Sequence, residues 1–407
     1  MANTLKFGNG QWATKEGSTL AYNSENNNYK PLPFTFDRDS VATRVNKQGL
    51  IETVGADQPR IDYLNDSNGA LLLEPSRTNL VTYSEDFSQS SWVGGNVTRE
   101  LNQIISPDGT LNATKLSATA SFSQIQQSYT SVNDTDYTFS IFVKSPSSNV
   151  IGLRLASGTN DVRREFNLST LSIQSMGGNN QELIDEGIID FGSGWYRIFL
   201  TCKSDGTSSF LNIYPKNSSD ATFQSVYVWG AMLEQGSYAT SIINTKGSAV
   251  TRLADSCNNG GNEQVINSTE GVLYAEISAL ANDGTNRQIS INNNGTSNRV
   301  YLEYSSVNNR IRGVVENSGG NQAILSAIVN DVKNYTKVAI KYKQNDFSLF
   351  INGFEVDTEL NGGVLVGLSE LSFDRGDGLS DFYGNVKDVR VYDTALTDQE
   401  LAALTQV

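Results

Sequence analysis

The chain of 407 residues contains no histidine. This absence excludes Ser-His-Asp and Cys-His triads, and it removes the commonest metal ligand and the usual acid–base group near neutral pH. Cysteine is scarce as well, because only Cys202 and Cys257 occur, far apart and outside any C-x-x-C motif. Neither a disulfide framework nor a zinc site is indicated, and a single long-range disulfide stays open.

Basic residues are also few, since 30 Lys and Arg stand against 44 Asp and Glu, which gives a net charge of −14. Such an acidic chain repels phosphate backbones, so we expect no nucleic-acid partner. No apolar run approaches the roughly 20 residues of a membrane span, and the start MANTLKFGNG lacks the pattern of a signal peptide. We therefore expect no membrane span. We also expect that the chain folds in a cytoplasm, or that it leaves the cell without a signal peptide, for example inside a particle that lysis releases.

Short alternating segments rich in aromatic and β-branched residues recur along most of the sequence, as in Tyr137–Val143 (YTFSIFV). Asn352-Gly353 predicts a hairpin, because this pair supplies the positive φ of a type I′ turn. A helix is predicted only at the last turn or two, where Thr397 is a plausible N-cap and Glu400 follows three residues later. These patterns predict an all-β fold of sandwiches and not a parallel α/β sheet.

Composition and turn signals divide the chain into four parts. Residues 1–78 are rich in Asn, Gly, Ser and Thr and predict an extended N-terminal arm, with a partly disordered leader as the alternative. Residues 79–255 and 271–407 each carry a strand series, so we expect two consecutive antiparallel β-sandwiches, or jelly rolls, joined by a linker at 256–270. Because the arm has too few apolar residues for a core, contacts with partners should order it.

Side chains near the arm carry two further predictions. Arg60 and Arg77 flank Asp57, Asp62 and Glu74, so buried Arg–carboxylate pairs are expected to fix the arm against the sandwich that follows. The aromatic pair that enters this sandwich is expected to anchor its core and not to bind a ligand: Phe87 and Trp92.

Three blocks of the sequence resemble known families. Phe34–Trp92 contains, in order, G-L-I-E, P-R-x-D-Y, L-L-x-E-x-x-R-T-N-L and S-x-x-F-x-x-x-x-W, and it resembles a segment of structural proteins of tailed bacteriophages. Val226–Asp255 resembles the closing strand of the jelly-roll carbohydrate-binding-like domain that follows this segment in such proteins. Phe382–Leu404 resembles the C-terminal end of laminin-G-like, concanavalin A-like sandwich domains.

These resemblances imply a virion structural protein, a head or tail fibre or a surface-decoration protein, assembled in the host cytoplasm. They imply that the arm contacts other virion proteins, that the sandwiches bind a glycan of the host surface, and that the chain forms a homo-oligomer, for which we expect a trimer. Two alternatives stay open. One is a glycan-degrading hydrolase of the tail-spike type, and the other is a purely architectural capsid component without a ligand.

Glycan binding needs aromatic faces that stack on sugar rings and planar polar groups that bind hydroxyls. The candidate glycan-binding residues are Tyr301, Tyr304, Asn293, Arg310 and Arg312. The alternative is that the Asn-rich runs beside them are ordinary turns, because Asn tolerates left-handed backbone geometry.

A second candidate is a loop with three aspartates and two glycines in nine residues, formed by Asp374, Asp377 and Asp381. Ca²⁺ takes six to eight oxygen ligands from such groups. The spacing does not match an EF-hand, and Arg375 lies inside the loop, so an ordinary solvated turn is the alternative. We expect no cofactor unless this loop holds calcium.

Catalysis by a glycosidase would require two carboxyls roughly 5 to 10 Å apart across a cleft. The carboxylates nearest to this requirement, besides the aspartate loop, are Glu276, Glu303 and Glu316. The E-x-D-x-E-type string of concanavalin-like glycosidases does not occur in this sequence. We therefore predict that the chain is not an enzyme.

Overall fold

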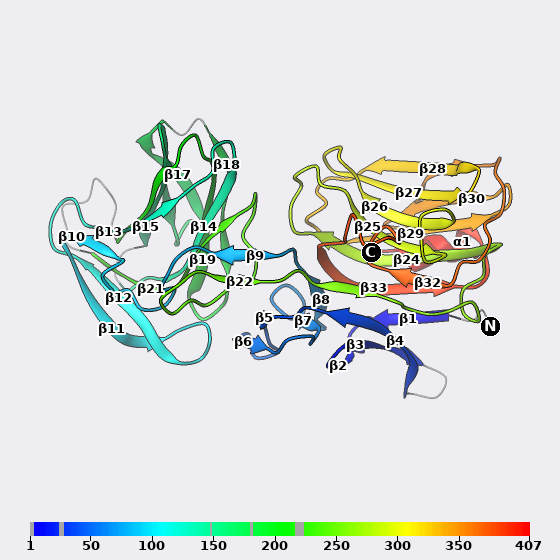
Figure 1. The fold of residues 1–407 in the computed structure, drawn as a ribbon, viewed down its shortest axis with the longest axis horizontal. Helices are drawn as coiled ribbons and strands as arrows, with labels where there is room; N and C mark the ends of the chain where they lie inside the picture. The colour runs from blue at the N-terminus through cyan, green and yellow to red at the C-terminus, as the bar shows by residue number, and fades with distance from the viewer. Residues whose placement is uncertain (1–3, 24–27, 147–148, 180–181, 216–223) are drawn as a thin grey trace. The chain divides into compact units, whose positions relative to one another are not determined.

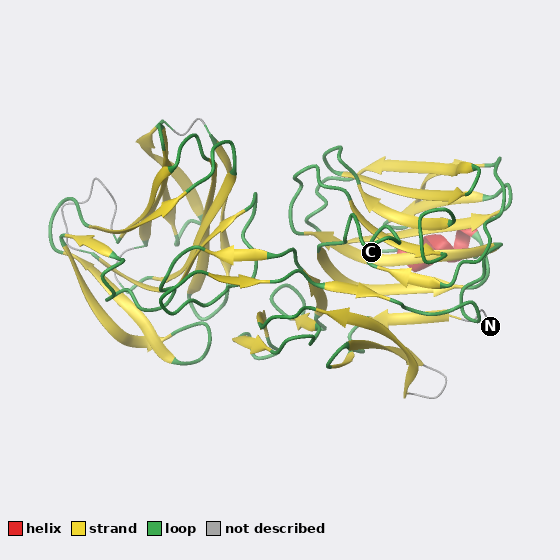
Figure 2. Cartoon of the chain, viewed as in Figure 1, coloured by secondary structure: helices red, strands yellow, loops and turns green. Residues whose placement is uncertain are grey.

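The computed structural model describes residues 4–23, 28–146, 149–179, 182–215 and 224–407 (Figure 1). Within these ranges nearly all regular structure is strand, and one helix occurs, α1 (Asp398–Thr405) (Figure 2). The strand pairs described in the two sandwiches are antiparallel, and one isolated bridge, between Gln288 and Asp381, is parallel. The predicted all-β class is confirmed.

The chain forms two compact units. Unit 1 comprises residues 1–41, 54–75 and 253–407, and unit 2 comprises residues 42–53 and 76–252. The strands of unit 1 are β1 (Thr4–Gly8), β2 (Ala13–Lys15), β3 (Ser18–Asn23), β4 (Asn28–Asp37), β7 (Arg60–Asp62), β8 (Ala70–Leu73), β23 (Ser256–Asn258), β24 (Glu270–Ala279), β25 (Arg287–Asn292), β26 (Arg299–Tyr304), β27 (Arg310–Asn317), β28 (Gly320–Ile328), β29 (Thr336–Lys343), β30 (Phe347–Ile351), β31 (Phe354–Glu359), β32 (Glu370–Ser372) and β33 (Gly384–Tyr392). The strands of unit 2 are β5 (Ala42–Val45), β6 (Ile51–Val54), β9 (Arg77–Asn79), β10 (Val93–Gly95), β11 (Val97–Ile105), β12 (Leu111–Ala118), β13 (Gln124–Thr130), β14 (Asp136–Lys144), β15 (Val150–Ser157), β16 (Asn160–Asn167), β17 (Ser172–Gly178), β18 (Leu183–Asp190), β19 (Trp195–Lys203), β20 (Ser208–Tyr214), β21 (Ser225–Gln235) and β22 (Val250–Arg252).

Unit 1 is a sandwich of two sheets. An eight-stranded sheet has the order β31-β30-β29-β24-β33-β8-β7, with β1 also paired to β33, and a five-stranded sheet has the order β28-β27-β26-β25-β32. Alternating residues of both sheets, such as Leu273, Ile289 and Ile340, form one apolar core. The predicted hairpin is present, because Ile351 pairs with Phe354 and φ is positive at both turn residues. The predicted capping box of α1 is confirmed as well.

The N-terminal residues are part of this sandwich. β1 pairs with β33 from Thr4 opposite Tyr392 to Gly8 opposite Asp388 (Figure 1). Phe34 lies in the core, with its ring centroid 4.2 Å from Phe7 and 5.2 Å from Phe373. The apolar residues of this region are sparse, but those of β1 and β4 point into the core of unit 1, which residues from the C-terminal part of the chain mostly form. The limits of the two units lie near residues 41, 53, 75 and 252, whereas the sequence predicted limits at 78, 255 and 270.

Unit 2 is a sandwich of two six-stranded sheets, β10-β13-β20-β15-β16-β17 and β11-β12-β21-β14-β19-β18. Its core includes Phe139, Leu153 and Leu211. Phe87 and Trp92 are buried in the same core with ring centroids 5.0 Å apart, which confirms their prediction as anchors. Cys202 lies in this unit and Cys257 in the other, and both are free, buried thiols, so the disulfide that the sequence left open is not formed.

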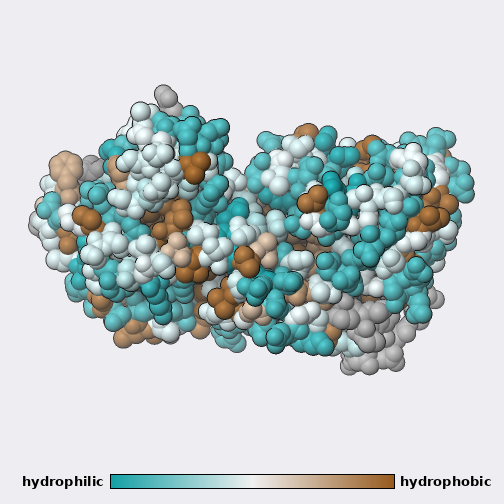
Figure 3. Space-filling view, viewed as in Figure 1, coloured by the Kyte–Doolittle hydropathy of each residue, from teal (hydrophilic) through white to brown (hydrophobic). Residues whose placement is uncertain are grey.

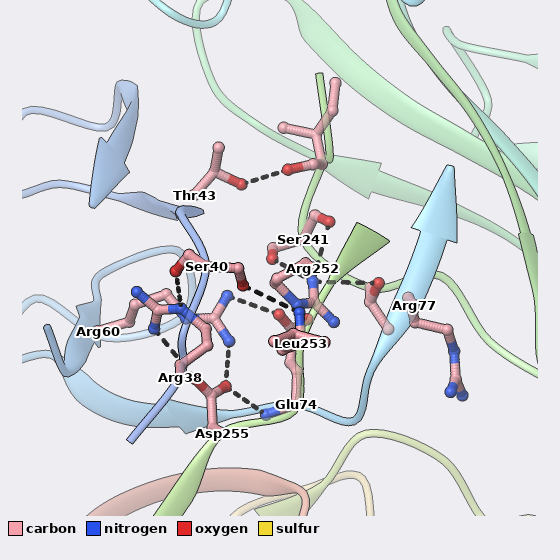
Figure 4. Close-up of polar contacts among 12 residues, drawn as sticks. Arg38, Ser40, Thr43, Arg60, Glu74, Arg77, Ser241, Arg252, Leu253 and Asp255 are labelled. Carbon is pink, nitrogen blue, oxygen red and sulfur yellow. Dashed lines mark hydrogen bonds and ion pairs between the residues drawn. The ribbon is translucent and has the colours of Figure 1, made fainter. Parts of the chain in front are cut away.

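A buried ion network stabilises unit 1 (Figure 4). Arg60 donates to Glu74 at 2.6 Å and is also paired with Asp255, and Arg38 donates to the other oxygen of Asp255 at 3.0 Å. A buried Arg–carboxylate pair, which the sequence predicted for this block, is therefore present between Arg60 and Glu74, but it lies within unit 1 and not against the sandwich that follows, and Asp255 is a partner that the sequence pattern did not indicate. Arg77 lies in unit 2, where its Nε is 3.5 Å from Glu234. All four side chains of the network are buried, so each charge depends on its partners.

Candidate functional site

The five-stranded sheet of unit 1 has a polar face on the side away from the core. In β26, residues Val300, Leu302 and Tyr304 enter the core, and since side chains alternate along a strand, Arg299, Tyr301 and Glu303 lie on the opposite face. The neighbouring strands β25 and β27 contribute to this face by the same alternation. We call it the C-terminal polar face and define it by Gln288, Arg299, Tyr301, Glu303, Arg312 and Glu316.

Ion pairs and hydrogen bonds fix the side chains of this face. Arg299 donates to Glu316 from Nε at 3.0 Å and from Nη2 at 2.8 Å, and its guanidinium lies 4.6 Å from the ring centroid of Tyr301. Glu303 accepts a hydrogen bond from Gln288 at 2.8 Å, and its second oxygen lies 3.0 Å from Arg312. Two arginines and two glutamates give the face no net charge.

Burial changes the acid–base behaviour of the tyrosine on this face. Tyr301 is 6% exposed, and desolvation raises the pKa of its hydroxyl. The hydroxyl is therefore protonated at neutral pH, where it can both donate and accept hydrogen bonds. Its aromatic ring presents little open surface, because the guanidinium of Arg299 covers it.

The structure separates the predicted glycan-binding residues. Tyr301 and Arg312 belong to the C-terminal polar face, and Arg310 lies at one end of it, where it donates to Ser305 at 2.7 Å. Asn293 lies at the other end, in the turn between β25 and β26, and donates to Ser297 at 3.2 Å. Tyr304 lies in the core, so it leaves the candidate set.

The physical reason is the two-residue period of a strand, which sends residues 301 and 304 to opposite faces. The same period would have indicated the residues that sequence reasoning missed as binding candidates on this face, which are Gln288, Arg299, Glu303 and Glu316.

The aspartate loop does not bring its three carboxylates to one point. Asp377 pairs with Arg375 at 2.6 Å, Asp381 accepts a hydrogen bond from the Tyr383 hydroxyl at 2.9 Å, and Asp374 accepts one from a backbone N–H within the loop. Among the described residues, no group of three or more Asp, Glu, Cys or His side chains is placed to hold a metal ion. The carboxylates thus have separate partners.

Electrostatics of the same loop follow from its burial. Desolvation raises the pKa of Asp374, and the nearby carboxylates, first among them Asp381, add to this rise. Desolvation also raises the pKa of Asp381. The loop borders the C-terminal polar face, because Arg299 donates to the carbonyl of Arg375 at 3.2 Å. It therefore forms a rim of the face.

Comparison with known families identifies the C-terminal sandwich. Residues 262–402 match the family model described as the concanavalin A-like lectin/glucanases superfamily. The prediction of a laminin-G-like, concanavalin A-like domain in this region is therefore confirmed. No curated protein matches the chain.

Solved structures are similar to parts of the chain at low identity. The CBM40 of a Ruminococcus gnavus IT-sialidase, bound to α2,3-sialyllactose, is 17% identical with a TM-score of 0.31, over 35% of this chain and 86% of that one. Domain 4 of a Geobacillus stearothermophilus GH43 arabinanase, in complex with arabinotriose, is 13% identical with a TM-score of 0.31, over 41% and 82%. Mouse laminin α1 domains LG4-5 are 8% identical with a TM-score of 0.23, over 67% and 90%. Nothing about the ligand of this chain follows from scores this low.

Two surface properties complete the description. In the part of the chain that the structure describes, no helix has the length and apolar character to cross a membrane. On the side shown in Figure 3, apolar side chains form small separate patches among polar ones. The surface in view therefore favours polar contacts over one large apolar interface.

Proposed function

We propose that this chain binds glycans without transforming them, and that the C-terminal polar face is one contact surface. The observation that carries the proposal is the match of residues 262–402 to the concanavalin A-like lectin/glucanases superfamily, on a sandwich whose sheet face away from the core is polar and uncharged overall. Planar amide and guanidinium groups are suited to the paired hydroxyls of a sugar.

The bonding within the face supports binding over hydrolysis. Glu303 and Glu316 are two of the carboxylates considered for the alternative hydrolase, and each is engaged by an arginine. Their oxygens hold the face in shape, so they serve as fixed acceptors next to Tyr301 and Arg312. A fixed polar array lowers the entropy cost of binding a flexible saccharide.

The biological setting that we propose rests on the sequence of residues 34–92, which resembles structural proteins of tailed bacteriophages. In this proposal the chain is a fibre or surface-decoration protein of the virion, forms a homo-oligomer such as a trimer, and attaches through its N-terminal region. In this proposal virion partners bind the four-stranded sheet β2-β3-β4-β23, to which the N-terminal region contributes β2, β3 and β4. Mass spectrometry of purified particles tests the setting, and absence of the chain from them contradicts it.

A glycan array with the full chain tests binding. We expect signals on host-surface polysaccharides that Arg312→Ala weakens about tenfold, the loss typical of a central polar anchor. The matched control is Lys343→Ala, which removes a cation from the opposite sheet of unit 1, where it pairs with Glu270. A blank array, or equal losses in both variants, contradicts the proposal.

A further inference from the structure

Unit 2 carries a second polar face, and none of the candidate site residues discussed so far belongs to it. It belongs to the six-stranded sheet β10-β13-β20-β15-β16-β17, on the side away from the core. In β20, Leu211 and Ile213 enter the core, so Phe210, Asn212 and Tyr214 lie together on the other side. We call the surface the unit 2 face and define it by Arg154, Asp161, Arg163, Phe210, Asn212 and Tyr214.

We propose that the unit 2 face is a glycan-binding site in its own right, and that its ligand is a neutral polysaccharide. The site is separate from the C-terminal polar face, and its residues come only from unit 2. Its support comes from three features: partly exposed aromatic rings, a fixed amide with an unused acceptor, and balanced charges.

The aromatic rings stand beside very small neighbours. Strand pairing places Ala156 beside Phe210 and Gly152 beside Tyr214. Both rings are only partly buried, unlike the ring of Tyr301. The space above Gly152 is taken by the thioether of Met176, since a Cβ built at this glycine would lie 2.6 Å from its sulfur. A flexible apolar thioether therefore covers Gly152 beside Tyr214, and this apolar surface suits the flat face of a pyranose ring.

Asn212 lies between the two rings, and its orientation is fixed. Its Nδ2 donates to the side-chain oxygens of Gln124 at 3.0 Å and Gln126 at 3.1 Å. Its Oδ1 has no hydrogen-bond partner among the described residues, although the residue is fully buried. Buried polar atoms in proteins are nearly always bonded, so an exception on a sheet face beside two aromatic rings indicates a missing donor, such as a sugar hydroxyl.

The charges of the face cancel. Asp161 accepts from Arg154 at 2.6 and 3.0 Å and from Arg163 at 2.6 Å, and the guanidinium of Arg154 lies 4.4 Å from the ring centroid of Phe210. A further carboxylate, Glu165, is buried next to them and is bonded to a glutamine. Two cations therefore meet two anions.

The ligand class follows from this balance. An acidic polysaccharide would gain no net attraction here, and it would approach a chain with a net charge of −14. A cationic ligand would compete with arginines that already hold Asp161. A neutral polysaccharide meets neither obstacle, and the planar side chains supply donors and acceptors for its hydroxyls.

Affinity electrophoresis of the full chain tests the proposal. Native gels contain either a neutral polysaccharide (galactomannan, xyloglucan or soluble dextran) or an acidic one (alginate). All proteins carry Tyr301→Ala and Arg312→Ala, which together weaken binding by the C-terminal polar face in the readout. We expect retardation in a neutral gel, weakened about tenfold by Tyr214→Ala and by Phe210→Ala, the loss typical of an aromatic anchor.

The matched control is Tyr227→Ala, because Tyr227 is a partly buried tyrosine on the outward side of the other sheet of unit 2. Melting temperatures of the three variants confirm folding. Retardation that only Tyr214→Ala and Phe210→Ala weaken supports the proposal. It is overturned if no neutral gel retards the protein, if alginate alone does, or if Tyr227→Ala has the same effect. The proposed function of the C-terminal polar face is judged separately, by comparing Tyr301→Ala with the unaltered chain.

Discussion

The polar sheet faces of the two units contain the same kinds of side chain, but their aromatic rings differ in exposure. In unit 1, the ring of Tyr301 is 6% exposed beneath Arg299, whose charge is balanced by Glu316. In unit 2, Phe210 and Tyr214 are partly open, and the arginine that contacts Phe210 is held by Asp161. In both faces an arginine that is held by a carboxylate lies over a ring, at 4.6 Å from Tyr301 and at 4.4 Å from Phe210, so the arginine contact alone does not decide how much of a ring is exposed.

The largest effect is expected from the ion network that only unit 1 needs. Asp255→Ala leaves Arg38 without its carboxylate partner and Arg60 with Glu74 alone, and breaking such a buried pair costs about 3–5 kcal/mol of unfolding free energy. Hydrogen exchange measured by mass spectrometry should become faster in peptides of unit 1, including β33, while peptides of unit 2 keep their protection.

The control for this experiment is Asp398→Ala, which removes an exposed partner of Lys341 and should cost no more than about 1 kcal/mol. If Asp255→Ala exposes both units equally, the two sandwiches depend on each other for stability and cannot be compared as independent faces.

The network also shows what a single sequence reveals and what it hides. Arg60 and Glu74 are 14 residues apart, and the charges of this block indicated a buried Arg–carboxylate pair without saying which residues would form it. Asp255 lies 195 residues from Arg60, and no local pattern connects them. Strand character was predictable from alternation, but the pairing of β1 with β33 depends on contacts between the two ends of the chain.

For the candidate sites as well, the sequence reveals some features and hides others. The alternation of Phe210, Asn212 and Tyr214 along β20 is enough to place them on one face. What made the face polar and balanced was the neighbouring strand, because Arg154 lies opposite Asn212 only through the register of β15 and β20. Register between distant strands is set by the whole core and is not visible in local composition.

A second prediction compares the two faces by ring removal. Tyr301→Ala should weaken glycan binding by unit 1 about threefold, less than the tenfold expected for Tyr214→Ala in unit 2, because a covered ring offers less contact surface. Isothermal titration with the best polysaccharide for each face measures both losses. Equal losses would mean that ring exposure does not distinguish the faces.

Acid is expected to lower the stability of unit 2 by a smaller amount than the effects above, through one carboxyl group. The arginines beside Asp161 lower the pKa of this carboxyl to about 2, from its ordinary value of 3.8, against the opposing effect of desolvation. A depressed pKa adds stability that is complete above about pH 4 and is lost as the pH falls toward 2. The difference in melting temperature between the unaltered chain and Asp161→Asn should therefore shrink across this window.

Since Asp161 is partly exposed, solvent screening limits its contribution to about 1 kcal/mol. Ser172→Ala, at an exposed position of β17 in the same sheet, is the control, because it removes no ionisable group and its melting-temperature difference from the unaltered chain should not change with pH. A constant difference for Asp161→Asn between pH 4 and pH 2 would show that its ion pairs do not stabilise the face.

The smallest effect is expected at the aspartate loop that borders the C-terminal polar face. Asp377 is exposed and paired only with Arg375 and a backbone N–H, so Asp377→Ala should change the unfolding free energy by less than about 0.5 kcal/mol. Because Asp374, Asp377 and Asp381 have separate partners, excess Ca²⁺ should leave the melting temperature unchanged in both proteins. A rise with Ca²⁺ that disappears in Asp377→Ala would show that the loop rearranges around the ion and that the rim of this face depends on calcium.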